Sequence, residues 1–233
     1  MAATDWTAVD GSLTTSDLDQ GKTNLQIAPP GGNSFIYGFS SVTNKDGASA
    51  LFNNGANFNP ISGKGARVSG AMIRRPAAAS FTGWSCFLFA GLQSDSLQAD
   101  CYMLGLLDAN PANIVLRKGS ISEGLQTAVV GENGVLAVSN DTFFEDNWIH
   151  LRLDVVVNVN NDVRLFVKRN DLAVNDVDEP VWEDVPGMAP VFQDSFGIQT
   201  DPGLVGGFVG FGYEQRELGR TAFFDHIECA RGL

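Results

Sequence analysis

The sequence contains few of the residues that most often carry out chemistry. Its 233 residues include only three cysteines and two histidines. Cys86, Cys101 and Cys229 form no C-x-x-C pair and lack the spacing of zinc ligands, so neither a disulfide framework nor a zinc site is indicated. We interpret the cysteines as small buried hydrophobic residues of a protein that is made in a reducing compartment.

Long hydrophobic runs and positive charge are also scarce. The longest apolar runs, such as Phe87–Leu92, fall far short of the roughly 20 residues that a membrane helix needs. The first residues have neither a basic nor an apolar segment, so we expect no signal peptide and synthesis in the cytoplasm. The chain has 15 basic and 27 acidic residues, a net charge of −12. We therefore expect neither nucleic acid nor a membrane as a partner.

The usual catalytic and phosphate-binding motifs are absent from the sequence. It contains no G-x-x-x-x-G-K-[ST], no G-x-G-x-x-G and no G-x-S-x-G. His226 and Glu228 form an H-x-E, but the P-C-x-x-C half of a zinc deaminase site is missing. We interpret His150 and His226 as surface or rim residues of two predicted strands.

Pairs of carboxylates are the signature of glycosidases, in which two acids lie roughly 5–10 Å apart across one sugar bond. On a strand, that geometry requires an i, i+2 or i, i+4 pair on one face. Glu183 and Asp184 are adjacent and would point to opposite faces. The other candidates lie in loops or turn-rich segments, and we interpret them as solvated charges: Glu145, Asp146, Asp176, Asp178 and Glu179.

Two further groups of residues have a ligand-binding and a structural interpretation. Oxygen-bearing side chains that calcium favours cluster at one turn: Asn158, Asn160, Asn161 and Asp162. The same residues are typical of a tight hairpin turn, which we favour, and a bound metal ion stays open as an alternative. Four tryptophans offer rings on which sugars stack: Trp6, Trp84, Trp148 and Trp182. Trp84 and Trp182 lie in predicted strands, where we expect them in the core. The sequence therefore names no catalytic, cofactor-binding or metal-binding residue, and we predict that the protein is not an enzyme and uses no cofactor.

Short apolar runs separated by turn signals predict an all-β, two-sheet antiparallel jelly-roll sandwich. The predicted strands are Ser34–Phe39, Ala50–Phe52, Ala66–Arg74, Trp84–Leu92, Asp100–Leu107, Ile114–Arg117, Val135–Val138, Trp148–Val157, Asp162–Arg169, Val181–Val185, Val205–Tyr213 and Thr221–Ala230. We expect residues 34–233 to form one domain. Residues 1–33 are polar and end in Pro29-Pro30-Gly31-Gly32, which predicts an extended N-terminal arm that packs on the body or reaches a neighbour.

One hairpin is specific enough to predict its register. In Trp148–Asn158 and in Asp162–Lys168 the apolar residues occupy odd positions, so both strands bury their odd side chains. Partners must then have numbers that sum to an even value, which requires an odd-length loop, most simply Val159–Asn161. Arg152 is thereby placed opposite Lys168, with Asp154 on the diagonal to offset the repulsion.

Alternating glycines mark the strand predicted over Val205–Tyr213, where Gly206, Gly210 and Gly212 share a face with Phe208. Such a row is typical of a bulge or of close approach by another layer. A flat ligand-binding surface is the alternative, and we favour tight internal packing of a curved sheet.

Two segments resemble the laminin-G-like jelly rolls. The first is Trp148-Ile149-His150-Leu151-Arg152-Leu153-Asp154-Val155, followed by Asp162-Val163-Arg164-Leu165. The second is Gly207-Phe208-Val209-Gly210-Phe211-Gly212, followed by Arg220 and Ala222-Phe223-Phe224-Asp225-His226-Ile227. This resemblance covers about the C-terminal third of the chain and implies a concanavalin A-like fold.

The chain also resembles structural proteins of tailed bacteriophages. The features that carry this resemblance are the Pro29–Gly32 break, Asn113–Ser120 (N-I-V-L-R-K-G-S) and Pro180–Met188. It implies a non-enzymatic virion component of the neck, tail or capsid surface that docks with other virion proteins and copies of itself. The alternative is a lectin-like module that binds carbohydrate on the host surface.

Overall fold

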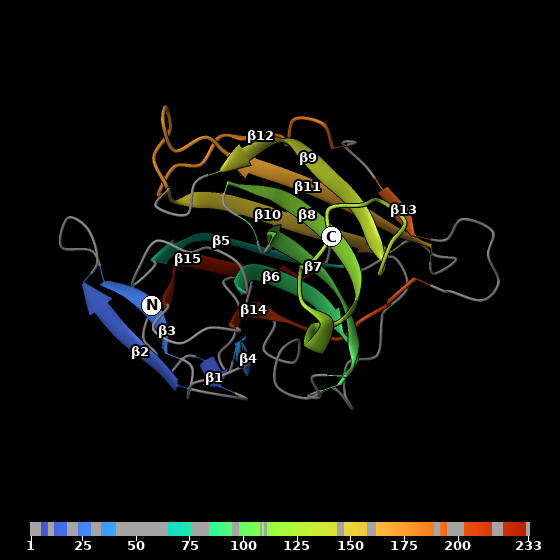
Figure 1. Cartoon of the computed structure of the whole chain (residues 1–233), viewed down its shortest axis with the longest axis horizontal. Helices are drawn as coiled ribbons and strands as arrows, with labels where there is room; N and C mark the ends of the chain where they lie inside the picture. The colour runs from blue at the N-terminus through green and yellow to red at the C-terminus, as the bar shows by residue number, and fades with distance from the viewer. Residues whose placement is uncertain are drawn as a thin grey trace.

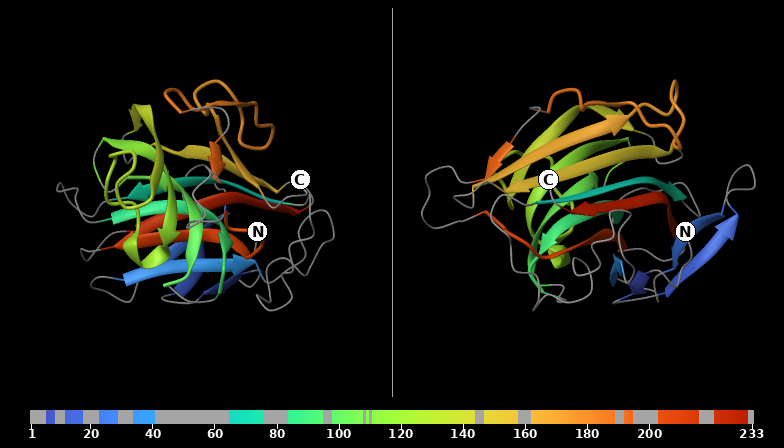
Figure 2. Two further views of the ribbon diagram at one scale, coloured as in Figure 1. Left: turned by 90° about the vertical axis from the view of Figure 1, so that its right-hand side faces the viewer. Right: turned by 180° about the vertical axis from the view of Figure 1, so that it is seen from behind.

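The computed structural model describes residues 6–8, 12–17, 23–28, 34–40, 65–75, 84–94, 98–107, 109, 111–143, 147–157, 162–188, 192–194, 203–215 and 221–231. These residues form two antiparallel β-sheets, which confirms the predicted all-β sandwich. Figure 1 shows the curved strands β7–β9 in front of β10 and β11, and Figure 2 shows the two layers from two further sides. Within this part of the chain, no helix is long and apolar enough to cross a membrane.

The two sheets draw their strands from distant parts of the sequence. Sheet A has seven strands in the spatial order β1 (Trp6–Ala8), β4 (Ser34–Ser40), β14 (Phe208–Gln215), β6 (Trp84–Leu92), β7 (Asp100–Leu106), β8 (Ala112–Ser120) and β9 (Val135–Phe143). Sheet B has eight, in the order β12 (Trp182–Asp184), β11 (Val163–Asn170), β10 (Ile149–Val157), β5 (Ala66–Arg75), β15 (Thr221–Arg231), β3 (Thr23–Ala28) and β2 (Ser12–Asp17), with β13 (Phe192–Asp194) paired to β11.

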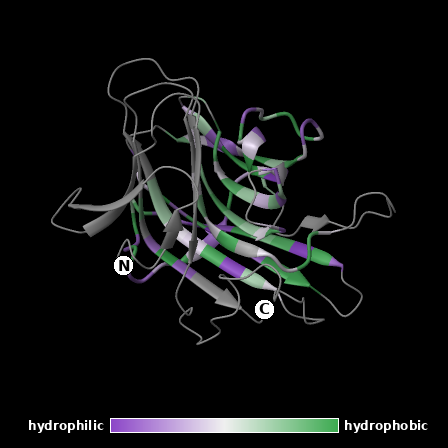
Figure 3. Cartoon of the chain, turned by 90° about the horizontal axis from the view of Figure 1, so that it is seen from below, coloured by the Kyte–Doolittle hydropathy of each residue, from purple (hydrophilic) through white to green (hydrophobic). Residues whose placement is uncertain are grey.

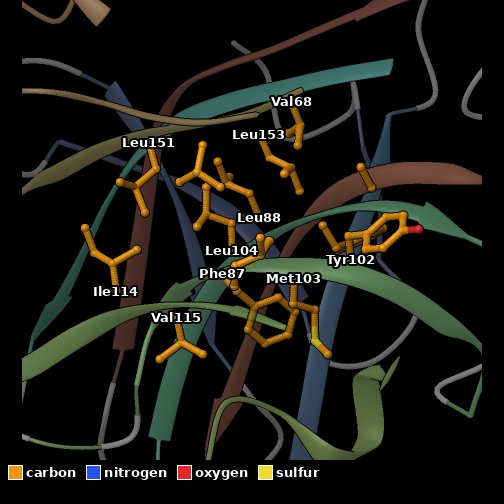
Figure 4. Close-up of a cluster of buried hydrophobic side chains, with 14 of the residues drawn as sticks. Val68, Phe87, Leu88, Tyr102, Met103, Leu104, Ile114, Val115, Leu151 and Leu153 are labelled. Carbon is orange, nitrogen blue, oxygen red and sulfur yellow. The ribbon is translucent and has the colours of Figure 1, made fainter. Parts of the chain in front are cut away.

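Alternating side chains from the two sheets meet in the core. Leu88 and Leu104, which are cross-strand partners in sheet A, face Leu151, Leu153 and other buried residues of sheet B (Figure 4). The alternation of hydrophobic and hydrophilic positions along the strands is visible in Figure 3. Because the side-chain period of a strand is two, burying the odd residues of β10 and β11 turns their even residues to the other face.

An aromatic contact joins the two sheets through one inner strand of each. The rings of Phe211 in β14 and Phe224 in β15 lie 4.7 Å apart between centroids, and both side chains are fully buried. Each ring removes a large apolar surface from water, and aromatic pairs add about 0.5–1.5 kcal/mol beyond that burial.

The outer face of sheet A is buried as well. Phe87, Met103 and Val115 point away from sheet B, and none of them is exposed to solvent. Residues 120–134, which include the 3-10 helix η4 (Ile121–Glu123), are fastened to this face by Arg117.

Arg117 is a buried cation, only 2% exposed, whose hydrogen bonds offset the cost of removing its charge from water. Its guanidinium donates to the carbonyl oxygens of Asn133 at 2.5 Å, Ser120 at 3.0 Å and Gly124 at 3.1 Å, and to the Glu123 carboxylate.

Most predicted strands match the structure closely. β6 has the predicted bounds, β10 starts one residue later than predicted, and β11 starts and ends one residue later than predicted. Residues 50–52 lie outside the described residues. The sequence did not predict β13, or the strands β1, β2 and β3 within residues 1–33. These three strands pair with β4, with β3 and with β15, which corresponds to packing on the body. The domain boundary after residue 33 stays a prediction.

The predicted hairpin register is confirmed. Arg152 pairs with Lys168, and all odd residues of β10 and β11 up to Val167 are buried. The loop at residues 158–161 lies outside the described residues, so the metal alternative for that turn stays untested. β14 starts at Phe208, later than predicted, because Gly206 and Gly207 have φ angles of +80° and +96° before a shift in register. This bulge supports the close-packing interpretation of the glycine-rich strand.

We predict that Phe211→Ala lowers the free energy of unfolding by about 3–5 kcal/mol, because removal of the ring leaves a cavity at the contact between the two sheets. Urea denaturation measures this loss. Val174→Ala is the matched control, since Val174 is 77% exposed, and it should change stability by less than about 0.5 kcal/mol. Equal effects of the two substitutions would contradict this account of the core.

Candidate functional site

The outer face of sheet B carries a polar and aromatic surface, which we call the outer-face patch. It comprises Arg67, Arg152, Asp154, Arg164, Phe166, Lys168, Trp182 and Asp184. Register places Arg67 beside Asp154 and Asp154 beside Phe166 in one row across β5, β10 and β11. In the next row, Arg152 lies beside Lys168 and Lys168 beside Asp184.

Asp154 organises the patch by binding two arginines from neighbouring strands. Arg67 donates through Nε at 2.7 Å and Nη2 at 3.2 Å, while Arg152 donates through Nε at 2.9 Å and Nη2 at 2.5 Å. Burial raises the pKa of Asp154, but the hydrogen bonds and charges of Arg152 and Arg67 outweigh burial and leave its pKa below the ordinary value. The carboxylate therefore stays ionised near neutral pH and holds both guanidinium groups in place.

Two half-buried aromatic rings lie among these charges. The guanidinium carbon of Arg152 lies 5.6 Å from the ring centroid of Trp182, a cation–π contact that orients both groups. Phe166 is half-buried opposite Asp154. The prediction that Trp182 is a core residue is wrong, because β12 is a three-residue edge strand whose Trp182 packs over the outer face of the sheet.

His150 is buried rather than at the surface or rim as predicted. Its side chain is covered by Trp182, with ring centroids 4.7 Å apart, and it lies 3.3 Å from the Asn170 amide nitrogen. Residues 171–181, which we call the strap, connect β11 to β12 beside it.

The hydrogen bonds of Asn170 fix the protonation of His150. The amide oxygen of Asn170 accepts from the backbone N–H of Val181, and its nitrogen donates to the carbonyl of Asp176. The same nitrogen faces Nδ1 of His150, which must therefore accept and carry no proton. Burial, followed by the charge of His226, lowers the pKa of His150 to about 4, with a smaller opposing effect of Glu228.

His226 lies on the same face as His150 and binds the strap. Its Nε2 is 2.5 Å from the Asp178 carboxylate, and its side chain is half-buried. The backbone of His226 has a φ of +49° at the register shift of β15, a conformation that non-glycine residues rarely adopt. The two histidines of the chain, 76 positions apart, thus meet beneath one short segment.

The remaining candidate residues lie apart from one another. Asp184 binds Lys168 on the patch, whereas Glu183 points the other way and binds Arg169, as the adjacent numbering predicted. Cys86 and Cys101 are buried free thiols, as predicted, and burial raises the pKa of Cys101. Trp148 is half-buried. The side chains of Trp6, Trp84, Glu145, Asp146 and Cys229 lie outside the described part. Across the described residues, no three His, Cys, Asp or Glu side chains form a group that could hold a metal ion.

No protein-family model and no curated protein matches the sequence. Among solved structures, the carbohydrate recognition domain of Emp47p matches with a TM-score of 0.51 and 10% identity, over 98% of this chain and 89% of that chain. The fold is a concanavalin A-like jelly roll. The potassium-bound carbohydrate recognition domain of Emp46p gives a TM-score of 0.50 at 11% identity, over 97% and 88% of the two chains. The carbohydrate-binding module CBM66 from Bacillus subtilis gives 0.46 at 16% identity, over 97% and 94%. At these identities the similarity extends to the fold alone.

We predict that lowering the pH from about 6.5 to about 4 reduces stability through His150. The unfolded chain binds a proton on this residue near pH 6.5, whereas the folded chain resists protonation until about pH 4. The stability that depends on Asp154 is lost only at lower pH, because its folded pKa lies below the ordinary value.

Urea denaturation at pH 7, 5.5 and 4.5 measures the effect of His150. The variant His150→Gln keeps an acceptor for Asn170 and should show a shallower loss of stability over this range. His226→Gln removes the smaller cause of the lowered pKa and leaves the burial of His150, so it should show a loss intermediate between those of the wild type and His150→Gln. A slope unchanged in His150→Gln would show that another group causes the pH dependence.

Proposed function

We propose that this protein binds carbohydrate without chemical turnover, through the outer-face patch. The observation that carries the proposal is the combination of Trp182 with Arg152 and Asp154 on one face of sheet B. Sugars present apolar C–H faces, which stack on aromatic rings, and hydroxyl groups, which bind planar charged groups with directional hydrogen bonds. The patch has both an aromatic ring and planar charged groups, and contacts with neighbouring residues hold them in place.

The fold of the chain supports this proposal. Emp47p and Emp46p, whose matching domains are named as carbohydrate recognition domains, share its two-sheet architecture. At 10–11% identity, the ligands of those domains do not indicate the ligand of this chain. The proposal therefore depends on the residues of the outer-face patch.

The chemistry of Asp154 argues against hydrolysis at the patch. A glycosidase needs one carboxyl group that is protonated at working pH and a second that faces it across the sugar bond. Asp154 is only 8% exposed and is kept ionised by two guanidinium groups, and Asp184 is engaged by Lys168. Neither carboxylate is therefore suited to act as a general acid.

We predict that Trp182→Ala weakens glycan binding about tenfold or more, equivalent to about 1.4 kcal/mol, because it removes the stacking surface. A glycan array with the full chain identifies ligands, and calorimetry measures their affinity. Val130→Ala, an exposed apolar residue of the segment over sheet A, is the control and should bind normally. Absence of binding to any neutral or acidic glycan would refute the proposed function.

We also propose a location for the protein, which is the particle of a tailed bacteriophage. The resemblance of Asn113–Ser120 and Pro180–Met188 to tailed-phage proteins supports a structural role in a virion, after synthesis in the host cytoplasm. The two segments form β8 and the region around β12. Docking with other virion proteins and with copies of itself is compatible with glycan binding, because the patch leaves other surfaces available.

We predict a native mass of at least twice the 24.9 kDa of one chain, together with presence of the chain in purified phage particles. Native mass spectrometry and particle proteomics test these two expectations. A monomer that is absent from particles would exclude the virion role and leave the glycan proposal intact.

A further inference from the structure

The outer-face patch is positively charged although the chain as a whole is strongly acidic. Four cations, Arg67, Arg152, Arg164 and Lys168, lie on it with the two carboxylates Asp154 and Asp184. Glu228 borders it beyond Ser69. The net charge of the chain is −12, so most of the protein repels the carboxylate of a ligand. The excess of cations on the outer-face patch attracts it.

The two arginines bound to Asp154 retain hydrogen-bonding capacity. Asp154 engages Nε and Nη2 of each guanidinium, and within the described residues neither Nη1 atom has a hydrogen-bond partner. One carboxylate thus orients two cations and neutralises only one of their charges. Because guanidinium groups bind carboxylates with paired, planar hydrogen bonds, this arrangement is suited to a second carboxylate.

The aromatic residues restrict the kind of anion that fits. Trp182 pairs with Asn170, four residues along β11 from Phe166, so the backbone positions of the two aromatic residues are offset by about 13 Å along the strand direction. The Arg152 guanidinium lies between these positions in the register. A ligand that uses both rings must be longer than one sugar ring and must carry its charge between its stacked parts.

We propose that the outer-face patch recognises acidic oligosaccharides, with a sugar carboxylate bound by Arg67 and Arg152 and sugar rings stacked on Phe166 and Trp182. This inference rests on the carbohydrate-binding function proposed above and adds the class of ligand. Arg164 and Lys168 lie two residues before and two residues after Phe166 on β11. Their charges add long-range attraction for further carboxylates of the same oligosaccharide.

The test compares each acidic oligosaccharide with its own neutral form. Hexamers of galacturonate, mannuronate and hyaluronan, and their methyl esters, are titrated into the full protein by calorimetry at low and moderate salt. We expect at least one acid to bind tenfold or more tightly than its ester, with an affinity that falls as salt rises. Arg164→Gln, an exposed position that should not affect folding, should weaken that binding severalfold.

Further variants separate the binding role from a structural one. Arg152→Gln should abolish the preference for the acid over the ester. The double variant Arg67→Gln with Asp154→Asn avoids an unpaired buried carboxylate but leaves Arg152 without its partner guanidinium, and it should weaken the preference. Arg169→Gln removes the same charge from β11 on the opposite face and should leave the preference unchanged.

Each other outcome overturns a defined part of the proposal. If the esters, or neutral glycans on the array, bind as well as every acid does, the acidic-ligand inference is wrong and carbohydrate binding stands. If oligo(dT) of similar charge binds as tightly as the best acid, the patch is a general polyanion surface and the inference is wrong. If no glycan of any kind binds, the proposed function fails together with the inference.

Discussion

The interdigitation of alternate side chains between sheets A and B is the constraint on which the structure depends. Leu88, Leu104, Leu151 and Leu153 occupy the space between the sheets, and no odd residue of β10 can leave this core without exposing the whole set. The same constraint turns the even residues outward on adjacent strands. Arg67, Arg152 and Asp154 meet for this reason, although Arg67 and Asp154 are 87 positions apart in the sequence.

The period-two pattern made the fold and one register predictable from the sequence. In β10 and β11 every buried odd residue is apolar, so the pairing of Arg152 with Lys168 followed from this alternation together with the shortest odd-length loop. The prediction that Asp154 offsets the repulsion between Arg152 and Lys168 was only partly right. Asp154 binds Arg152, whereas Asp184 binds Lys168. Strands β1 to β3 were missed because residues 1–33 are polar and lack a clear alternating pattern.

The site was less predictable because it depends on elements that carry no periodic signal. His150 occupies an outward position on β10, which predicts exposure, yet Trp182 of an edge strand and the hydrogen bonds of Asn170 enclose it. Strand periodicity predicts on which face of the sheet a side chain lies, but it does not predict whether another element covers that face. An outward histidine that alternates with Arg152 and Asp154 was the one available signal, since the three residues share a face.

The contact between β9 and the end of β12 has a consequence for association with other chains. Arg169 of sheet B binds Asp141 of sheet A, and the backbone N–H of Asn140 donates to the carbonyl of Pro186. The terminal strands of the two sheets thus cover each other along one side of the sandwich. Extension of a sheet by a strand from a second molecule is hindered on that side, and the opposite terminal strands of the two sheets are β1 and β2.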